Sequence, residues 1–233
     1  MSSVEHEMWD GLNIEYEQAY GDNPFKKACV HKAIDLLKPG SRVLDVGCGT
    51  GVPTSQLLAQ AGMQVESIDV APKMVEHARR RIKGVFTTSD MEGYAPSGSF
   101  AGIFIIYSQL GLSFPSFCAS VYKLAKTLQP GGLLTIGQSP ADPTVPKDDP
   151  KWDETRTFVE GYNLPFWGKP FPTLMFSREG QKRWLESLGL DVVYETVDVY
   201  QPDDEKCDAE HQQYVIAQWK GEGSVSEPWP LPG

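Results

Sequence analysis

The sequence lacks a long hydrophobic run. No stretch approaches the roughly eighteen consecutive apolar residues that a membrane-spanning helix needs. A secretory signal has a basic cluster followed by an apolar segment. The first ten residues carry acidic side chains and lack this pattern. We therefore expect a soluble, cytoplasmic protein without a membrane partner.

Cysteine is scarce as well, with 4 residues in a chain of 233. No two of them have the spacing of a metal-binding or redox pair. The positions are Cys29, Cys48, Cys118 and Cys207. This scatter argues against a disulfide framework and against a zinc site, so we expect packed free thiols and no metal.

Basic residues are few relative to acidic ones, 21 against 31, which gives a formal net charge of -10. Affinity for phosphate backbones and anionic membranes depends on concentrated Lys and Arg. The one basic cluster, at residues 79–83, falls at the end of a predicted helix, where cations complement the helix dipole. We therefore expect that nucleic acid is not a partner.

Apolar residues in the first part of the chain alternate between the strand period and the helix period. Short apolar or β-branched runs predict strands at residues 42–46, 65–68, 85–87, 103–107 and 133–136. Helical spacing predicts helices at residues 29–37, 53–61, 72–82 and 115–128. Because each crossover helix lies over the sheet, this alternation favours a parallel sheet covered on both faces. We expect one α/β domain over residues 1–220.

The second part of the chain departs from this alternation. Residues 139–176 are rich in proline and aromatic side chains and predict an insertion. A helix at residues 178–188 then precedes two runs, 192–200 and 214–219, that predict closing strands. The tail at residues 221–233 is small, polar and contains proline, which predicts flexibility.

A glycine-rich turn follows the first predicted strand. The run DVGCGTG at residues 45–51 leads from a strand into a helix, and glycine lets the backbone approach a ligand closely because it has no Cβ. Asp69 ends the second strand, where a carboxylate can accept both hydrogen bonds of a ribose diol. The alternative is a solvated Asp that caps the next helix.

The spacing of this turn separates two classes of cofactor. A dinucleotide fingerprint would have its third glycine where this chain has Val52, and the Asp45 carboxylate does not suit a pyrophosphate. An acidic group beside the turn instead suits a ligand with an ammonium or sulfonium cation. An NAD-linked reductase is therefore disfavoured.

Together these residues resemble the class I S-adenosylmethionine-dependent methyltransferases, in the branch that contains small-molecule and quinone methyltransferases. The run VLDVGCGTG at residues 43–51 is similar to the first motif of the family, and VESID at 65–69, followed by Met74, to the second. The runs SDME at 89–92, FAGIFIIYS at 100–108 and LQPGGL at 128–133 resemble its later motifs.

The resemblance implies a Rossmann-like, doubly wound sheet of seven strands, mostly parallel with one antiparallel strand, and helices on both faces. It implies transfer of a methyl group from S-adenosylmethionine, with S-adenosylhomocysteine as product, to an O, N, S or C nucleophile of a small, largely apolar molecule. The cofactor contacts that it implies are Tyr20, Asp45, Gly47, Cys48, Gly49, Asp69, Val70, Met74, Asp90, Met91, Tyr107 and Ser108.

Aromatic residues in two segments are candidates for contact with the acceptor. Residues 1–40 resemble the amino-terminal lid and helix of the family, and residues 139–176 form the predicted insertion. The candidates are Trp9, Tyr16, Tyr162, Phe166, Trp167, Phe171 and Phe176. Their density favours an apolar, aromatic acceptor, and mutual packing under a long loop is the alternative for each ring.

Two positions depart from the pattern of the family. Ala101 stands where the fourth-strand motif usually begins with Asp, and Gly111 stands near a position where many relatives carry His. The general base is therefore open, with His6 and His211 as candidates. The departure also leaves open a cyclase that binds S-adenosylmethionine without transferring its methyl group, and a non-catalytic binding subunit. The acceptor and the oligomeric state stay open at this point.

Overall fold

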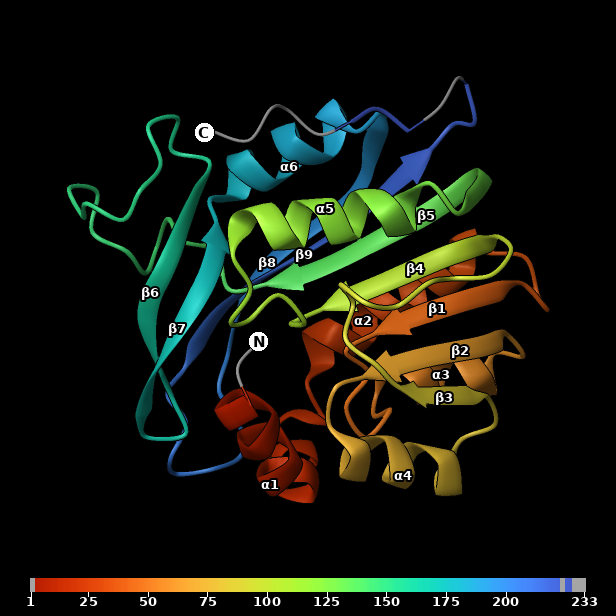
Figure 1. The fold of residues 1–233 in the computed structure, drawn as a ribbon, viewed down its shortest axis with the longest axis horizontal. Coiled ribbons are helices and arrows are strands. Elements are labelled where there is room, and N and C mark those ends of the chain that lie inside the picture. Colours follow the sequence, from red (N-terminus) through yellow and green to blue (C-terminus); the bar gives the residue numbers. More distant parts are fainter. Residues whose placement is uncertain (1–2, 223–224, 228–233) are drawn as a thin grey trace.

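The structure is a computed structural model, and it describes residues 3–222 and 225–227. Figure 1 shows a central twisted sheet with helices on both faces and a separate hairpin at one side. The strands of the sheet are β1 (Arg42–Val46), β2 (Gln64–Asp69), β3 (Val85–Thr88), β4 (Phe100–Ile106), β5 (Leu128–Gln138), β8 (Leu190–Tyr200) and β9 (Glu210–Trp219).

The order of the seven strands across the sheet is β3-β2-β1-β4-β5-β9-β8. Pairing is parallel from β3 to β5, and β9 runs antiparallel to both β5 and β8. The predicted seven-stranded, mostly parallel sheet with one antiparallel strand is confirmed.

Six helices of the described residues surround the sheet. They are α1 (Ser3–Tyr20), α2 (Pro24–Leu36), α3 (Thr54–Gln60), α4 (Pro72–Arg81), α5 (Phe114–Ala125) and α6 (Arg178–Ser187). Helices α5 and α6 cover one face, and α2, α3 and α4 cover the other. None of these helices is long and apolar enough to cross a bilayer.

Strand β4 shows why the central strands read as continuous apolar runs. Ile103 and Ile105 belong to the core under α5 and α6, whereas Phe104 and Ile106 belong to the core under α2, α3 and α4. Successive side chains of a strand point to opposite faces. Because both faces of this sheet are covered, every position along the strand is apolar.

The described residues differ from the predicted elements in two places. The helix predicted at residues 115–128 ends at Ala125, where Thr127 turns the chain by donating from both its backbone nitrogen and its hydroxyl to the Leu124 carbonyl. Strand β5 then begins at Leu128 and runs through the Pro-Gly-Gly sequence, with an irregularity in its register against β4 that accommodates it.

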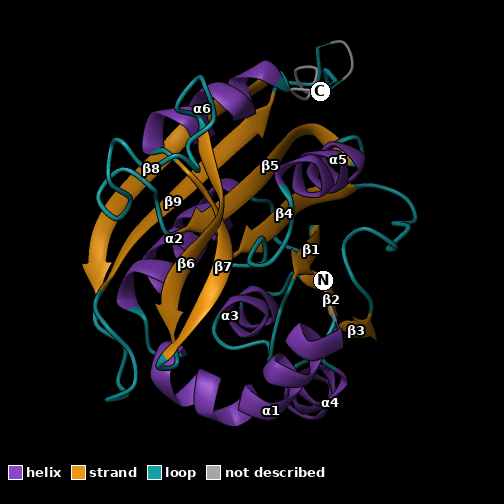
Figure 2. Cartoon of the chain, turned by 60° about the vertical axis from the view of Figure 1, so that its left-hand side comes forward, coloured by secondary structure: helices purple, strands orange, loops and turns teal. Residues whose placement is uncertain are grey.

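The second difference is a hairpin within the predicted insertion, formed by β6 (Phe158–Phe166) and β7 (Lys169–Phe176). Trp167 and Gly168 form its turn with φ angles of 54° and 71°, as a tight hairpin turn with two left-handed residues requires. Figure 2 shows the tip of the hairpin near α1. There the ring of Phe166 lies 5.2 Å from that of Trp9.

Helix α1 is held over the sheet by contacts with α4. Arg81 donates to both carboxylate oxygens of Glu17, at 2.8 and 2.6 Å, and the backbone nitrogen of Lys73 donates to Asp10 at 2.7 Å. Two residues of the basic cluster at 79–83 form ion pairs within the chain, Arg80 with Glu76 and Arg81 with Glu17. This pairing positions α1 beside the carboxyl ends of the strands.

Part of the predicted flexible tail is described. Val225 is buried in the core under α5 and α6, and the backbone nitrogen of Ser226 donates to the Leu188 carbonyl at 3.1 Å. Residues 223–224 and 228–233 of that prediction lie outside the described residues.

A substitution of Phe176 tests the core under α5 and α6. Its ring is 1 % exposed and lies 5.2 Å from the ring of Trp184 and 5.8 Å from that of Phe117. We expect Phe176→Ala to lower the free energy of unfolding by about 3–5 kcal/mol, because it leaves a cavity among large rings. The matched control Val199→Ala, at an exposed position of β8, should change it by about 0.5 kcal/mol or less. Urea denaturation followed by tryptophan fluorescence measures both, and equal effects would contradict the assignment of Phe176 to the core.

Candidate functional site

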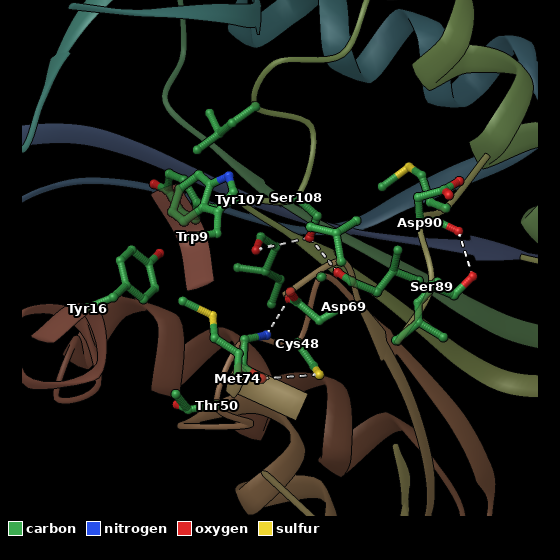
Figure 3. A pocket seen from close by; sticks show the side chains of 18 of the residues that line it. Trp9, Tyr16, Cys48, Thr50, Asp69, Met74, Ser89, Asp90, Tyr107 and Ser108 are labelled. Atoms are coloured by element: carbon green, nitrogen blue, oxygen red, sulfur yellow. Dashed lines mark hydrogen bonds between the residues drawn. The ribbon is translucent and has the colours of Figure 1, made fainter. Parts of the chain in front are cut away.

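A cavity of about 220 Å³ opens at the carboxyl ends of β1, β2 and β4. The strand order reverses here, because β1 is flanked by β2 on one side and by β4 on the other. In open α/β sheets a ligand binds at such a switch point. Trp9 and Tyr16 of α1 lie on one side of the cavity in Figure 3, and Ser89 and Asp90 lie on the other.

The glycine turn brings backbone to the cavity wall. Gly47 has a φ of 69°, which disfavours a side chain there. A Cβ at this position would lie 2.5 Å from the Ser108 hydroxyl oxygen, and that hydroxyl donates to the Val46 carbonyl. The backbone nitrogens of Gly47 and Cys48 both donate to the Ile68 carbonyl, at 2.8 and 3.0 Å. The turn is therefore clamped to the ends of β2 and β4.

Asp69 lies between the two sides of the cavity in Figure 3. Its Oδ2 accepts from the Gly49 nitrogen at 2.7 Å, and its Oδ1 accepts from the Ala71 nitrogen at 2.9 Å. Burial raises the pKa of Asp69, and these backbone hydrogen bonds oppose the rise. Each carboxylate oxygen retains a second acceptor site. The side chain thus braces the turn, starts α4 and still faces the cavity.

Asp45 lies beneath the turn rather than in the cavity wall. It is 2 % exposed, and its Oδ2 accepts from the Ser55 hydroxyl at 2.6 Å. That hydroxyl also lies 2.9 Å from the hydroxyl of Ser67. Burial raises the pKa of Asp45 to about 6. Asp45 does not line the first cavity, so this geometry does not support the predicted direct contact with a ligand.

The twelve predicted cofactor contacts fall into two groups. Ten of the twelve positions line the cavity, and Tyr20 and Asp45 do not. The ten are Gly47, Cys48, Gly49, Asp69, Val70, Met74, Asp90, Met91, Tyr107 and Ser108. Asp90, exposed at the far side, accepts from the Gly93 nitrogen at 2.5 Å. One cavity thus gathers residues that follow four different strands.

A second cavity, of about 260 Å³, adjoins the first. Four residues line both, namely Tyr16, Lys26, Tyr107 and Leu110. Its other walls come from the hairpin, with Phe166 and Phe171, from Tyr20 of α1, and from the start of β9. The rings of Tyr16 and Tyr20 stack with centroids 4.7 Å apart. The insertion and the predicted lid therefore enclose this cavity together.

The predicted acceptor contacts and bases lie in several environments. Trp9 and Tyr16 line the first cavity, and Tyr16, Phe166 and Phe171 line the second. Trp167 packs against Tyr16 and Tyr20, Tyr162 packs beside Val159, and Phe176 is a core ring, so these three line neither cavity. His211 is exposed at the rim of the second cavity. The side chain of His6 lies outside the described part of the chain.

Sequence reasoning missed Lys26 and Glu210, two charged residues that line the second cavity. Lys26 lies three and four positions before Cys29 and Val30, which are buried on α2. A lysine on the apolar face of a helix is a signal that could have been used. Burial lowers the pKa of Lys26, and the nearby Asp45 opposes this. Glu210 begins a strand among polar residues and gives no comparable signal.

Comparison with known proteins shows matches in the first part of the chain. A family model described as a methyltransferase domain matches residues 43–132. A 2-methyl-6-phytyl-1,4-hydroquinone methyltransferase of Synechocystis is 28 % identical over 50 % of this chain and 42 % of its own length. A ubiquinone biosynthesis O-methyltransferase of Xanthomonas oryzae is 33 % identical over 51 % of this chain and 52 % of its own length. The chain thus spans about half the length of these curated relatives.

Solved structures share the fold over most of the chain. A 1,6-didemethyltoxoflavin-N1-methyltransferase of Burkholderia thailandensis superposes with a TM-score of 0.64 at 16 % identity, over 93 % of this chain and 88 % of that one. A magnesium protoporphyrin IX methyltransferase of Synechocystis superposes with a TM-score of 0.62 at 18 % identity, over 93 % and 98 %. The likeness of fold thus covers far more of the chain than the family model does.

The buried Asp45 makes stability depend on pH in a defined direction. Its pKa rises from 3.8 to about 6 on folding, so the folded state binds more protons between these values and its stability falls as pH rises through this window. We expect wild type to lose up to about 3 kcal/mol relative to Asp45→Asn between about pH 4 and pH 7.

Urea denaturation of both proteins across this range gives the difference. Ser55→Ala removes the hydrogen bond that lowers the pKa of Asp45. It should therefore extend the pH range over which stability falls to higher pH. A constant difference between wild type and Asp45→Asn at all pH values would contradict the assignment.

Proposed function

Because this chain belongs to the class I S-adenosylmethionine-dependent methyltransferase family, we propose that it transfers a methyl group from S-adenosylmethionine to a small molecule. The observation that carries the proposal is the first cavity, in which the glycine turn, the Asp69 carboxylate and the aromatic side chains of α1 meet. The second cavity, which shares a wall with the first, is the proposed acceptor site.

The residues of the first cavity suit the parts of this cofactor. The turn exposes backbone at Gly47, where a Cβ would meet Ser108, so the methionine portion can lie against it. Asp69 has acceptor sites left for a ribose diol, and Asp90 and Met91, which line the same cavity, are the proposed contacts of the adenine. The ammonium of Lys26, at the wall shared by the cavities, suits the carboxylate of the methionine portion.

The chemistry of the site requires alignment and exclusion of water. S-adenosylmethionine supplies a methyl group already activated on a sulfonium sulfur. The chain has to hold the acceptor in line with that methyl group and keep water away. Tyr16 and Tyr107 line both cavities, so their rings border the passage between cofactor and acceptor. Ring faces also stabilise a sulfonium cation by about 0.5–2 kcal/mol per contact.

The second cavity supports a small, largely apolar acceptor. The cavity has a volume of about 260 Å³, and its walls include Leu164, Phe166 and Phe171. The matched relatives are named for action on hydroquinones and in ubiquinone biosynthesis. An aromatic acceptor fits both the walls and these relationships.

Binding of S-adenosylhomocysteine tests the role of Asp69. We expect Asp69→Ala to weaken the affinity measured by calorimetry by about 1.5–3 kcal/mol, because it removes charged hydrogen bonds to the ribose. The matched control Asp35→Ala removes an exposed carboxylate of α2 outside both cavities and should leave the affinity unchanged. Unaltered affinity in Asp69→Ala would remove this residue from the site.

Turnover tests the reaction itself. We expect the purified protein, incubated with methyl-labelled S-adenosylmethionine and an extract of its native host, to label a small molecule and form S-adenosylhomocysteine. A product of unchanged mass, formed without consumption of the methyl donor, would favour a cyclase instead. Absence of affinity for either nucleoside would favour a non-catalytic binding subunit.

A further inference from the structure

The second cavity contains a carboxylate that is unusual for its surroundings. Glu210, at the start of β9, is half-buried and lines the cavity together with Tyr16, Tyr20 and Phe166. Burial raises the pKa of Glu210 above its usual range. Removing a carboxylate from water among apolar groups is costly unless hydrogen bonds or a cation compensate it.

Two neutral donors orient this carboxylate. The Tyr20 hydroxyl donates to Oε1 at 2.5 Å, and the Gln212 amide donates to Oε2 at 3.2 Å. Gln212 is itself fixed, since its Oε1 accepts from the Asn23 amide and from the Tyr214 hydroxyl, each at 2.8 Å. The carboxylate is thus held in one place, and each of its oxygens keeps a free acceptor site.

Glu210 lacks a cationic partner among the described side chains. Among the side chains that the structure describes, it takes part in no ion pair. Lys26 lines the same cavity, but the carboxylate that opposes the lowering of its pKa is that of Asp45 beneath the glycine turn. Within the described residues, hydrogen bonds from two neutral donors therefore stabilise Glu210, and no ion pair does.

The rings around Glu210 add to the attraction for a cation. Tyr16 stacks on Tyr20 with centroids 4.7 Å apart and an angle of 19°, and Phe166 and Phe171 meet at 6.0 Å across the hairpin. The face of an aromatic ring attracts cations, and the effect grows as water is excluded. A carboxylate and ring faces that border one cavity form a typical site for an organic ammonium.

We propose, on the basis of the function proposed above, that the acceptor is an amine with a flat, apolar body, and that Glu210 selects it by binding its ammonium group within the ring-lined second cavity. Transfer of one ammonium proton to the Glu210 carboxylate leaves the neutral amine, whose lone pair forms the new N–C bond as the S–C bond of the methyl donor breaks and S-adenosylhomocysteine leaves. Tyr20 and Gln212 act as positioning residues for the carboxylate.

Ligand affinities test the proposal directly. Calorimetry, with and without saturating S-adenosylhomocysteine, would compare phenethylamine and tryptamine with two analogues of phenethylamine that have a similar body, the neutral phenethyl alcohol and the anionic hydrocinnamate. We expect wild type to bind the amines about tenfold or more tightly than the alcohol, because a charged hydrogen bond is lost in the alcohol, and to bind the anion least.

Variants assign the preference to Glu210. Glu210→Gln keeps the size of the side chain and should lose about tenfold or more of the amine affinity while changing that for the alcohol little. Glu205→Gln makes the same change of charge in the neighbouring loop, outside both cavities, and should keep the preference. Tyr20→Phe retains the carboxylate but removes one of the two hydrogen bonds that orient it, and should reduce the preference for amines less than Glu210→Gln does.

Three outcomes would overturn the proposal. These are an alcohol that binds wild type as tightly as the amines, no saturable binding of either amine, and an unchanged preference in Glu210→Gln. S-adenosylhomocysteine is titrated into the same preparations, so its failure to bind overturns the proposed methyltransferase function separately. Binding of this nucleoside without amine preference overturns only the choice of acceptor.

Discussion

The site depends on the close approach of three strand ends around a turn that has no side chain at Gly47. The turn after β1 donates from two backbone nitrogens to the Ile68 carbonyl of β2, and Gly49 donates to Asp69. On the other side, Ser108 after β4 donates to the Val46 carbonyl of β1. Because a Cβ at Gly47 would meet Ser108, this approach requires glycine. The hydrogen bonds that hold these three strand ends together therefore also form the wall of the cavity.

The alternation of strands and helices along the first part of the chain was predictable because it follows from the burial of both faces of the sheet. Every strand from β3 to β5 is parallel, and helices cover both faces, so apolar runs mark these strands in the sequence. The β6–β7 hairpin could not be predicted in this way. Its prolines and aromatic residues are typical of a loop, and its turn places Trp167 in the left-handed region, which residue type does not indicate. Contacts with α1, distant in the sequence, stabilise the hairpin instead.

Within the site, motifs predicted backbone positions better than side-chain directions. The glycines and Asp69 are determined by local turn geometry, and the structure brings them to one cavity. Asp45 shows the limit of this reasoning. Leu44 and Val46 belong to the core under α5 and α6, so the alternation of the strand points Asp45 to the opposite face, where Ser55 of α3 donates to it. The period of two in a strand, applied to the motif itself, would have corrected the prediction.

The two cavities share one cationic residue and differ in their acidic ones. Lys26 lies at the shared wall, with Asp45 beneath the turn as the carboxylate that opposes the lowering of its pKa. Asp69 lines the first cavity, whereas Glu210 lies on the side of the second cavity formed by β9. Residues far apart in the sequence thus set the charges that line each cavity. Because Tyr20 both stacks on Tyr16, which lines both cavities, and donates to Glu210, the position of α1 over the sheet links the walls of the two cavities.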